Sequence, residues 1–247
     1  FQIIKTEFAG LLRNKYFYFI IIFFTATLVS MSRSNWLGFV IGLVAAGLIL
    51  IINYDIKTIA RLVLKGLLIT GASVVLIFFI IKFPLPGSYD INAAAALSER
   101  AQNIDSEAGA SSRWSLLPVI NNGIKDNLVF GAGFGATLSY KSSDPRVLAS
   151  NSDGMYTTSA FEWGWHDIWF KLGLGGVLTY VLLLISIFYS QNKKLYKNFQ
   201  FIASLLGLLI IITIHTFSPY LNHPLGIGYL LIIFFYKDQV LRSLVKV

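Results

Sequence analysis

The sequence predicts an all-α integral membrane protein of about six transmembrane helices with one large extracytoplasmic loop. Hydrophobic residues make up 55% of the 247 positions and charged residues only 13%, whereas a soluble domain carries about 25% charged residues. The mean hydropathy is +0.68, and several apolar runs approach the roughly 20 residues that cross a bilayer as a helix. Helices are expected because an open sheet leaves backbone groups unsatisfied in lipid. The lack of cysteine excludes disulfides, thiolate nucleophiles and cysteine-ligated metals.

Six apolar runs are candidate spans, three before and three after a long polar stretch. We expect one membrane domain with helices over 1–82, an extracytoplasmic loop over 83–165 and helices over 166–247. The first residue is Phe1 rather than methionine, which predicts a fragment of a longer protein. The spans are expected at about Tyr16–Ser30, Asn35–Ile52, Leu62–Ile81, Asp167–Tyr189, Phe201–Phe217 and Leu225–Tyr236.

The basic residues follow the pattern of a protein with a defined membrane orientation. Twelve of the 20 lysines and arginines lie in the four short segments that share one side, opposed there by three acidic residues. The stretch from Phe83 to Trp165 carries five basic and eight acidic residues, a net charge of −3. Because short cytoplasmic segments are enriched in lysine and arginine, both termini are predicted in the cytoplasm and the long loop outside. The net charge of +8 is thus explained by basic residues that set the orientation of the protein in the membrane. It does not indicate a nucleic-acid partner, and none is expected.

The long loop contains one predicted helix. Apolar residues recur there at helical spacing, at Trp114, Leu117, Ile120 and Ile124. Such a helix is amphipathic and is expected to lie on the outer membrane surface. It should begin near Ser115, because Pro118 is tolerated only in the first turn of a helix.

The short connection Ser32-Arg33-Ser34-Asn35 is the first candidate site. It places Arg33 at or just inside the outer face of the membrane, where a cation is costly unless it is paired or functional. The alternative is an interfacial arginine that binds a lipid headgroup.

The pair Arg113-Trp114 is the second candidate. A guanidinium offers a planar fork that suits phosphate, and a helix N-terminus would favour the same ligand. The alternative is a solvated loop arginine.

Gly131 and Gly133 follow in a cluster that fits a relaxed dinucleotide fingerprint, but no βαβ unit surrounds it. A tight turn that lets the loop pack on the membrane helices is expected instead.

The third candidate is His166-Asp167 at the outer end of a span. Histidine is the usual proton carrier near neutral pH. Asp167 and Lys171 are spaced to form an i,i+4 ion pair, and the glycines at 173, 175 and 176 would let a neighbouring helix approach closely. The alternative is a polar helix cap at the interface.

A metal site is not predicted. His166, His215 and His223 all lie near the outer ends of spans, but their spacing matches no metal motif.

Three short stretches, taken in this order and topology, resemble the O-antigen ligase and polymerase family of bacterial membrane glycosyltransferases, in its C-terminal half. Three positions depart from the family pattern: Ser34 replaces a glycine, a proline is absent near Leu128, and Asp167 replaces an asparagine. The resembling stretches are Ser32 to Leu37, Arg113-Trp114 through Asn127 to Gly135, and His166 to Gly176.

The resemblance implies transfer of a glycan from undecaprenyl diphosphate to an acceptor hydroxyl at the outer face of the cytoplasmic (inner) membrane. The acceptor would be lipid A core, another glycan or a protein, and neither a cofactor nor a metal would be needed. Arg33 and Arg113 would neutralise the diphosphate, and His166 would take the acceptor proton with Asp167 as an orienting partner. Contact between protonated His166 and phosphate remains open. The resemblance implies further substrate contacts at Ser32, Trp114, Gly131 and Gly133.

Two other classes of function compete with this interpretation. A transporter or flippase of lipid-linked sugars is the leading alternative, although it should show inverted repeats and polar sites at the membrane midplane. A non-catalytic membrane scaffold would not need two arginines and a histidine on one face. Glycan transfer predicts that Arg33, Arg113 and His166 converge within about 10–12 Å on the outer side.

Overall fold

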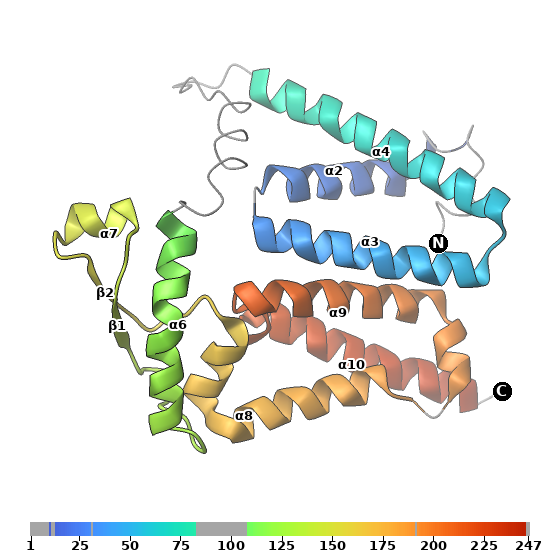
Figure 1. The fold of residues 1–247 in the computed structure, drawn as a ribbon. Helices are drawn as coiled ribbons and strands as arrows, with labels where there is room; N and C mark the ends of the chain where they lie inside the picture. The colour runs from blue at the N-terminus through green and yellow to red at the C-terminus, as the bar shows by residue number, and fades with distance from the viewer. Residues whose placement is uncertain (1–9, 11–12, 31, 83–107, 191, 246–247) are drawn as a thin grey trace. The chain divides into compact units, whose positions relative to one another are not determined.

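The computed structural model describes residues 10, 13–30, 32–82, 108–190 and 192–245, and helices occupy all six predicted apolar runs (Figure 1). Residues 83–107, the first part of the predicted extracytoplasmic loop, lie outside the described residues. The chain divides into two compact units, residues 1–93 and 94–247.

The first unit contains α2 (Lys15–Val29), α3 (Arg33–Asn53) and α4 (Ile56–Lys82). Helices α2 and α4 pack together through Phe17 and Ile21, which are buried against the apolar face of α4. The hydroxyl of Ser73 on α4 donates to the carbonyl of Ile21 at 3.3 Å. Small and apolar side chains therefore join these two helices.

The chain is a multi-pass membrane protein. Among the described residues, five helices are long and apolar enough to span a bilayer, namely α3, α4 and the three C-terminal helices. Helix α2 has 15 residues and is about 22 Å long, which is short of the ~30 Å hydrocarbon core. Five of the six predicted spans thus correspond to helices long and apolar enough to cross a membrane, and the number of spans stays a prediction.

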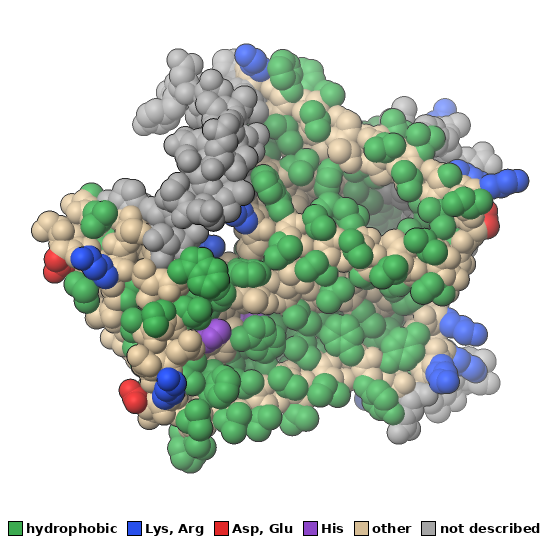
Figure 2. All heavy atoms as spheres, in the orientation of Figure 1, with side chains coloured by type: hydrophobic (Ala, Val, Ile, Leu, Met, Phe, Trp, Pro, Cys, Tyr) green, Lys and Arg blue, Asp and Glu red, His purple; other side chains and the backbone are tan. Residues whose placement is uncertain are grey.

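The second unit contains α8 (Gly164–Phe188), α9 (Phe199–Phe217) and α10 (Pro224–Val245). Two 3-10 helices, η2 (Lys193–Lys197) and η3 (Tyr220–Asn222), connect them. Hydrophobic side chains cover the flanks of these helices, whereas Lys and Arg side chains lie at the end where η2 is found (Figure 2). The buried core between them is formed by Leu184, Ile187, Leu195, Phe201, Leu208, Leu221, Leu230, Ile233 and Val240.

The loop between the two groups of spans is structured over residues 108–163. It contains α6 (Ala108–Asp126), β1 (Leu138–Lys141), the short α7 (Pro145–Ser150) and β2 (Met155–Thr158). The strands pair antiparallel, with Leu138 opposite Thr158. This small hairpin adds strands to a fold that was predicted to be all-α.

The predicted start of the loop helix near Ser115 is wrong. Helix α6 begins at Ala108, and Pro118 lies in its interior. Because proline has no N–H, no hydrogen bond from position 118 can reach the carbonyl of Trp114, which costs about 3 kcal/mol. Burial of Leu116, at 1% exposure, and of its neighbours along the helix offsets this cost.

The buried stripe of α6 also differs from the predicted one. It repeats every four residues and packs against β1 and α8, while Trp114 is 63% exposed. The helix is therefore amphipathic, with its apolar face turned to the protein, and its position at the membrane surface stays a prediction. The stripe consists of Ser112, Leu116, Ile120 and Ile124.

Candidate functional site

Trp163 joins two of the predicted site residues at the start of α8. Its indole Nε1 donates to the backbone carbonyl of Arg113 at 2.9 Å. Its ring lies 5.2 Å from the ring of Trp114 and 6.1 Å from that of His166, edge-on in both cases. Arg113 and His166, 53 positions apart in the sequence, therefore border the same side chain. Sequence reasoning missed Trp163, although its place between two candidate motifs was a usable signal.

The Arg113 guanidinium forms an ion pair with Glu162 through Nε. Both side chains are about half exposed, at 40% and 49%, so the pair is solvent-screened and is worth at most about 1 kcal/mol. Arg113 lies in the second turn of α6 because the helix begins at Ala108. The predicted helix N-terminus at Arg113 is therefore wrong, and its phosphate affinity rests on the guanidinium alone.

The predicted ion pair between Asp167 and Lys171 is confirmed, with 2.6 Å between Nζ and Oδ1. The other carboxylate oxygen, Oδ2, accepts from Asn222 Nδ2 at 2.6 Å. Asp167 is 1% exposed, and inside the protein Oδ1 is held by the ion pair and Oδ2 by the hydrogen bond. It ties α8 to η3, and the contacts of the described residues give no hydrogen bond to His166. The expected orienting role of Asp167 toward His166 thus lacks support.

Replacing Lys171 by methionine is expected to destabilise the protein by about 3 kcal/mol, because removal of one partner leaves Asp167 as a buried, uncompensated charge. The double variant Lys171→Met with Asp167→Asn should recover part of this loss. Chemical unfolding in detergent followed by circular dichroism measures both. Equal stability of Lys171→Met and wild type would contradict the assignment of a buried ion pair.

The glycine cluster after α6 docks on α8, as the predicted tight turn requires. The amide of Ala132 donates to the carbonyl of Phe170 at 2.7 Å, and that of Gly133 to Lys171 at 3.0 Å. In the reverse direction, Leu174 donates to the carbonyl of Leu128 at 3.0 Å. The N–H groups of this turn are therefore engaged by the protein, and the glycines expected to contact substrate have a structural role.

Gly173 is the reason that α8 can receive this turn. Its φ of +65° kinks the helix and frees the carbonyls one turn earlier for the loop. A Cβ at Gly173 would lie against the carbonyl of Val129 and 2.6 Å from the amide of Gly131. The predicted close approach at this glycine is confirmed, but the approaching segment is the loop and not a neighbouring helix. Gly175 has open space around its Cβ position.

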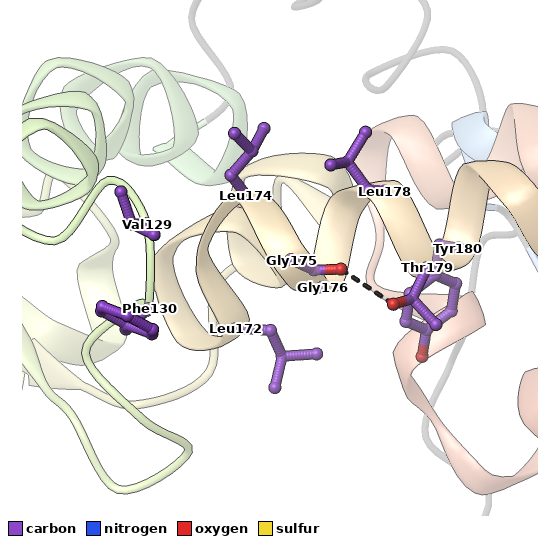
Figure 3. Close-up of a pocket in the computed structure, with 9 residues that line it drawn as sticks. All are labelled: Val129, Phe130, Leu172, Leu174, Gly175, Gly176, Leu178, Thr179 and Tyr180. Carbon is purple, nitrogen blue, oxygen red and sulfur yellow. Dashed lines mark hydrogen bonds between the residues drawn. The ribbon is translucent and has the colours of Figure 1, made fainter.

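An apolar groove of about 590 Å³ lies beside the kink, between the loop and α8 (Figure 3). Thr179 in its wall donates to the carbonyl of Gly175 at 2.8 Å, so its hydroxyl is satisfied within the helix. The groove is therefore suited to an apolar chain. Its lining consists of Val129, Phe130, Leu172, Leu174, Gly175, Gly176, Leu178, Thr179 and Tyr180.

The remaining histidines have structural contacts. His215 is buried, and its Nδ1 accepts from the amide of Leu221 at 3.1 Å. His223 is exposed, and its Nδ1 accepts from the amide of Leu225 at 3.4 Å. In the part of the chain that the structure describes, no three His, Asp or Glu side chains come together as metal ligands would.

Ser32 and Arg33 open α3 in the first unit. The hydroxyl of Ser32 caps the helix by accepting from the amide of Asn35 at 3.4 Å. Arg33 is the first helical residue, and its side chain is exposed. Because Arg33 belongs to residues 1–93, its convergence with Arg113 and His166 stays a prediction.

Comparison with known proteins gives one match. A family model described as O-antigen ligase matches residues 18–181, a range that includes Arg33, Arg113 and His166. No curated protein and no solved structure matches. The matched range covers more than half of the chain and all three motifs that carried the resemblance, so the chain belongs to the O-antigen ligase family.

Proposed function

We propose that this chain transfers a glycan from undecaprenyl diphosphate to an acceptor hydroxyl at the outer face of the bacterial cytoplasmic membrane. The observation that supports it most is the pair of contacts of Trp163, which borders both Arg113 and His166. Trp163 thereby links the backbone of Arg113 and the ring of His166 at the start of an apolar helix. That combination suits a substrate with an anionic headgroup, a hydroxyl nucleophile and a lipid tail.

The proposed step is a displacement at the anomeric carbon of the donor. The acceptor oxygen bonds to this carbon while the bond from the carbon to the diphosphate oxygen breaks, and the electron pair leaves with undecaprenyl diphosphate. The acceptor proton passes to the imidazole of His166. Arg113 stabilises the charge on the leaving diphosphate. Its contact with Glu162 uses Nε, and the two terminal nitrogens are the donors that we assign to phosphate.

Arg33 is proposed as a second contact of the diphosphate. Arg33 is the first helical residue of α3, where the helix dipole favours an anion. An anion bound there would interact favourably with both the helix N-terminus and the guanidinium. Ser32 would hold the start of the helix in place through its cap.

The apolar groove on α8 is proposed to hold the first part of the polyprenyl chain. Leu172 and Leu178 line it, and at 1.5 Å per residue Leu172, which precedes the kink at Gly173, lies roughly 9 Å along the helix from His166. A lipid chain entering there would leave its diphosphate at the level of the histidine. The predicted orientation, with both ends of this segment in the cytoplasm, would put that level outside.

The test uses the full-length protein purified in detergent, with undecaprenyl-diphosphate glycan and a candidate acceptor, in EDTA. Release of undecaprenyl diphosphate is followed by mass spectrometry. We expect release by the wild type and a loss of roughly 10²–10³-fold in Arg113→Ala, because one donor to the leaving group is removed.

Lys125→Ala is the matched control, because Lys125 is an exposed cation near the other end of the same helix. It should release product at the wild-type rate. Undiminished release by Arg113→Ala would remove Arg113 from the site. Donor binding without release, combined with movement of the donor across vesicles, would favour a flippase.

A further inference from the structure

A second cavity lies beside Arg113, lined by residues of α6, β1, α7 and β2. Its volume is about 460 Å³, within the ~300–1,000 Å³ that small-molecule sites occupy. Unlike the groove on α8, it is lined mostly by polar groups. The lining residues are Ser112, Arg113, Tyr140, Ser142, Asp144, Val147, Ser150, Tyr156 and Glu162.

Three buried hydroxyls form the inner wall of this cavity. Ser112 Oγ lies 2.8 Å from Ser142 Oγ and 3.2 Å from Tyr140 Oη. Ser112 is 7% exposed and Ser142 3%. Two mutual hydrogen bonds use two of the three hydroxyl protons, so one proton and several lone pairs remain for a ligand. Burial raises the pKa of Tyr140, which keeps its hydroxyl protonated.

The charges of the lining disfavour an anion. One guanidinium, that of Arg113, is accompanied by the carboxylates of Asp144 and Glu162, and Glu162 already pairs with it. By formal charge, the side chains that line the cavity comprise one cation and two anions. A polyhydroxylated neutral ligand would instead find carboxylates that accept, a guanidinium that donates and the exposed ring of Tyr156 as an apolar contact.

The position of the cavity connects it with the reaction. Arg113 and Glu162 belong to its lining, and the residue after Glu162 is Trp163, which borders His166. The cavity therefore shares Arg113 with the groups assigned to glycan transfer.

We propose that this cavity is a saccharide subsite that holds an uncharged sugar unit of a glycan substrate next to the reacting groups. The proposal rests on the proposed function for the origin of the sugar, which is the acceptor or the donor glycan. Its chemical selectivity, for neutral sugars over anions, follows from the lining alone.

Binding is measured first, by saturation-transfer NMR on the full-length protein with glucose, galactose, rhamnose and N-acetylglucosamine, and with inorganic diphosphate by calorimetry. At least one neutral sugar should bind, and its affinity should fall about tenfold in Tyr156→Ala and in Ser142→Val. Diphosphate binding should not change. Met155→Ala is the matched control, because Met155 is the exposed neighbour of Tyr156 and does not line the cavity.

Kinetics then identify the source of the sugar. A higher KM for the acceptor alone in Tyr156→Ala assigns the subsite to the acceptor, and a higher KM for the donor alone assigns it to the donor glycan. The inference is overturned if no sugar of the panel binds, or if binding persists equally in both cavity variants. Sugar binding without any glycan transfer would instead overturn the proposed function and leave the subsite standing.

Discussion

His166→Ala is expected to lower kcat for glycan transfer by about 10²–10⁴-fold, the usual contribution of a positioned acid or base. His166 is half-buried at the start of α8, with its ring edge-on to that of Trp163. Among the described residues, no side chain or backbone group hydrogen-bonds to its ring nitrogens, so we expect both to be available for an acceptor hydroxyl. The measurement is the rate of undecaprenyl diphosphate release at saturating donor and acceptor.

The two possible roles of His166, proton acceptor and phosphate contact, predict different kinetics for its variants. If the neutral imidazole takes the acceptor proton, added free imidazole should restore part of the rate of the alanine variant, and the donor KM should be unchanged. If the imidazolium contacts phosphate, the donor KM rises and His166→Lys keeps part of the activity. His223→Ala is the control, because His223 is exposed and near the same end of the bundle. A wild-type rate in His166→Ala would exclude both roles.

The membrane helices could be predicted from the sequence because the bilayer core contains no water to bond with the backbone. Backbone N–H and C=O groups there must form hydrogen bonds within the same segment, so an apolar run of sufficient length becomes a helix. The predicted Phe201–Phe217 corresponds to α9 at Phe199–Phe217. Helix α2, with 15 residues, is the one run whose length leaves the membrane span unsettled.

The polar loop could not be predicted in the same detail. Strand β1 is four residues long, and its partner β2 follows only after α7, so no two-residue turn signals a hairpin. Pro118 predicts a helix that begins near Ser115, whereas α6 begins at Ala108. The burial of Leu116 and Ile120 against the rest of the protein stabilises the longer helix. In such helices, tertiary packing outweighs intrinsic helix propensity.

Sequence motifs identify the residues of the candidate site, but they do not predict which side chains those residues contact. Arg113 and His166 were named from residue type and position, whereas the indole that joins them required the fold. Asn222 lies 55 positions from Asp167, and no local pattern links the two. A side chain that positions another side chain is hard to recognise in a single sequence, because the two residues lie far apart along the chain.

Gly173→Ala is expected to undock the loop from α8 and to destabilise the protein by about 5 kcal/mol. The backbone of Gly173, at φ +65° and ψ −165°, lies in a region open almost only to glycine, where another residue costs about 1–3 kcal/mol. The new Cβ would also lie 2.6 Å from the amide of Gly131. The loop would have to leave, with loss of hydrogen bonds worth about 1 kcal/mol each. The lost bonds are Ala132 to Phe170, Gly133 to Lys171, Leu174 to Leu128 and Trp169 Nε1 to Leu128.

Gly175→Ala is the matched control for this change, two positions further along the same helix. Its Cβ would meet nothing within 4 Å, so alanine should stabilise the helix by roughly 0.5–1 kcal/mol. Chemical unfolding in detergent compares the two variants, and hydrogen exchange at 128–133 reports undocking directly. We expect fast exchange there in Gly173→Ala together with a lower rate of glycan transfer, because the apolar groove shares Val129 and Phe130 with that loop. Equal stability of the two variants would show that the kink at Gly173 does not hold the loop.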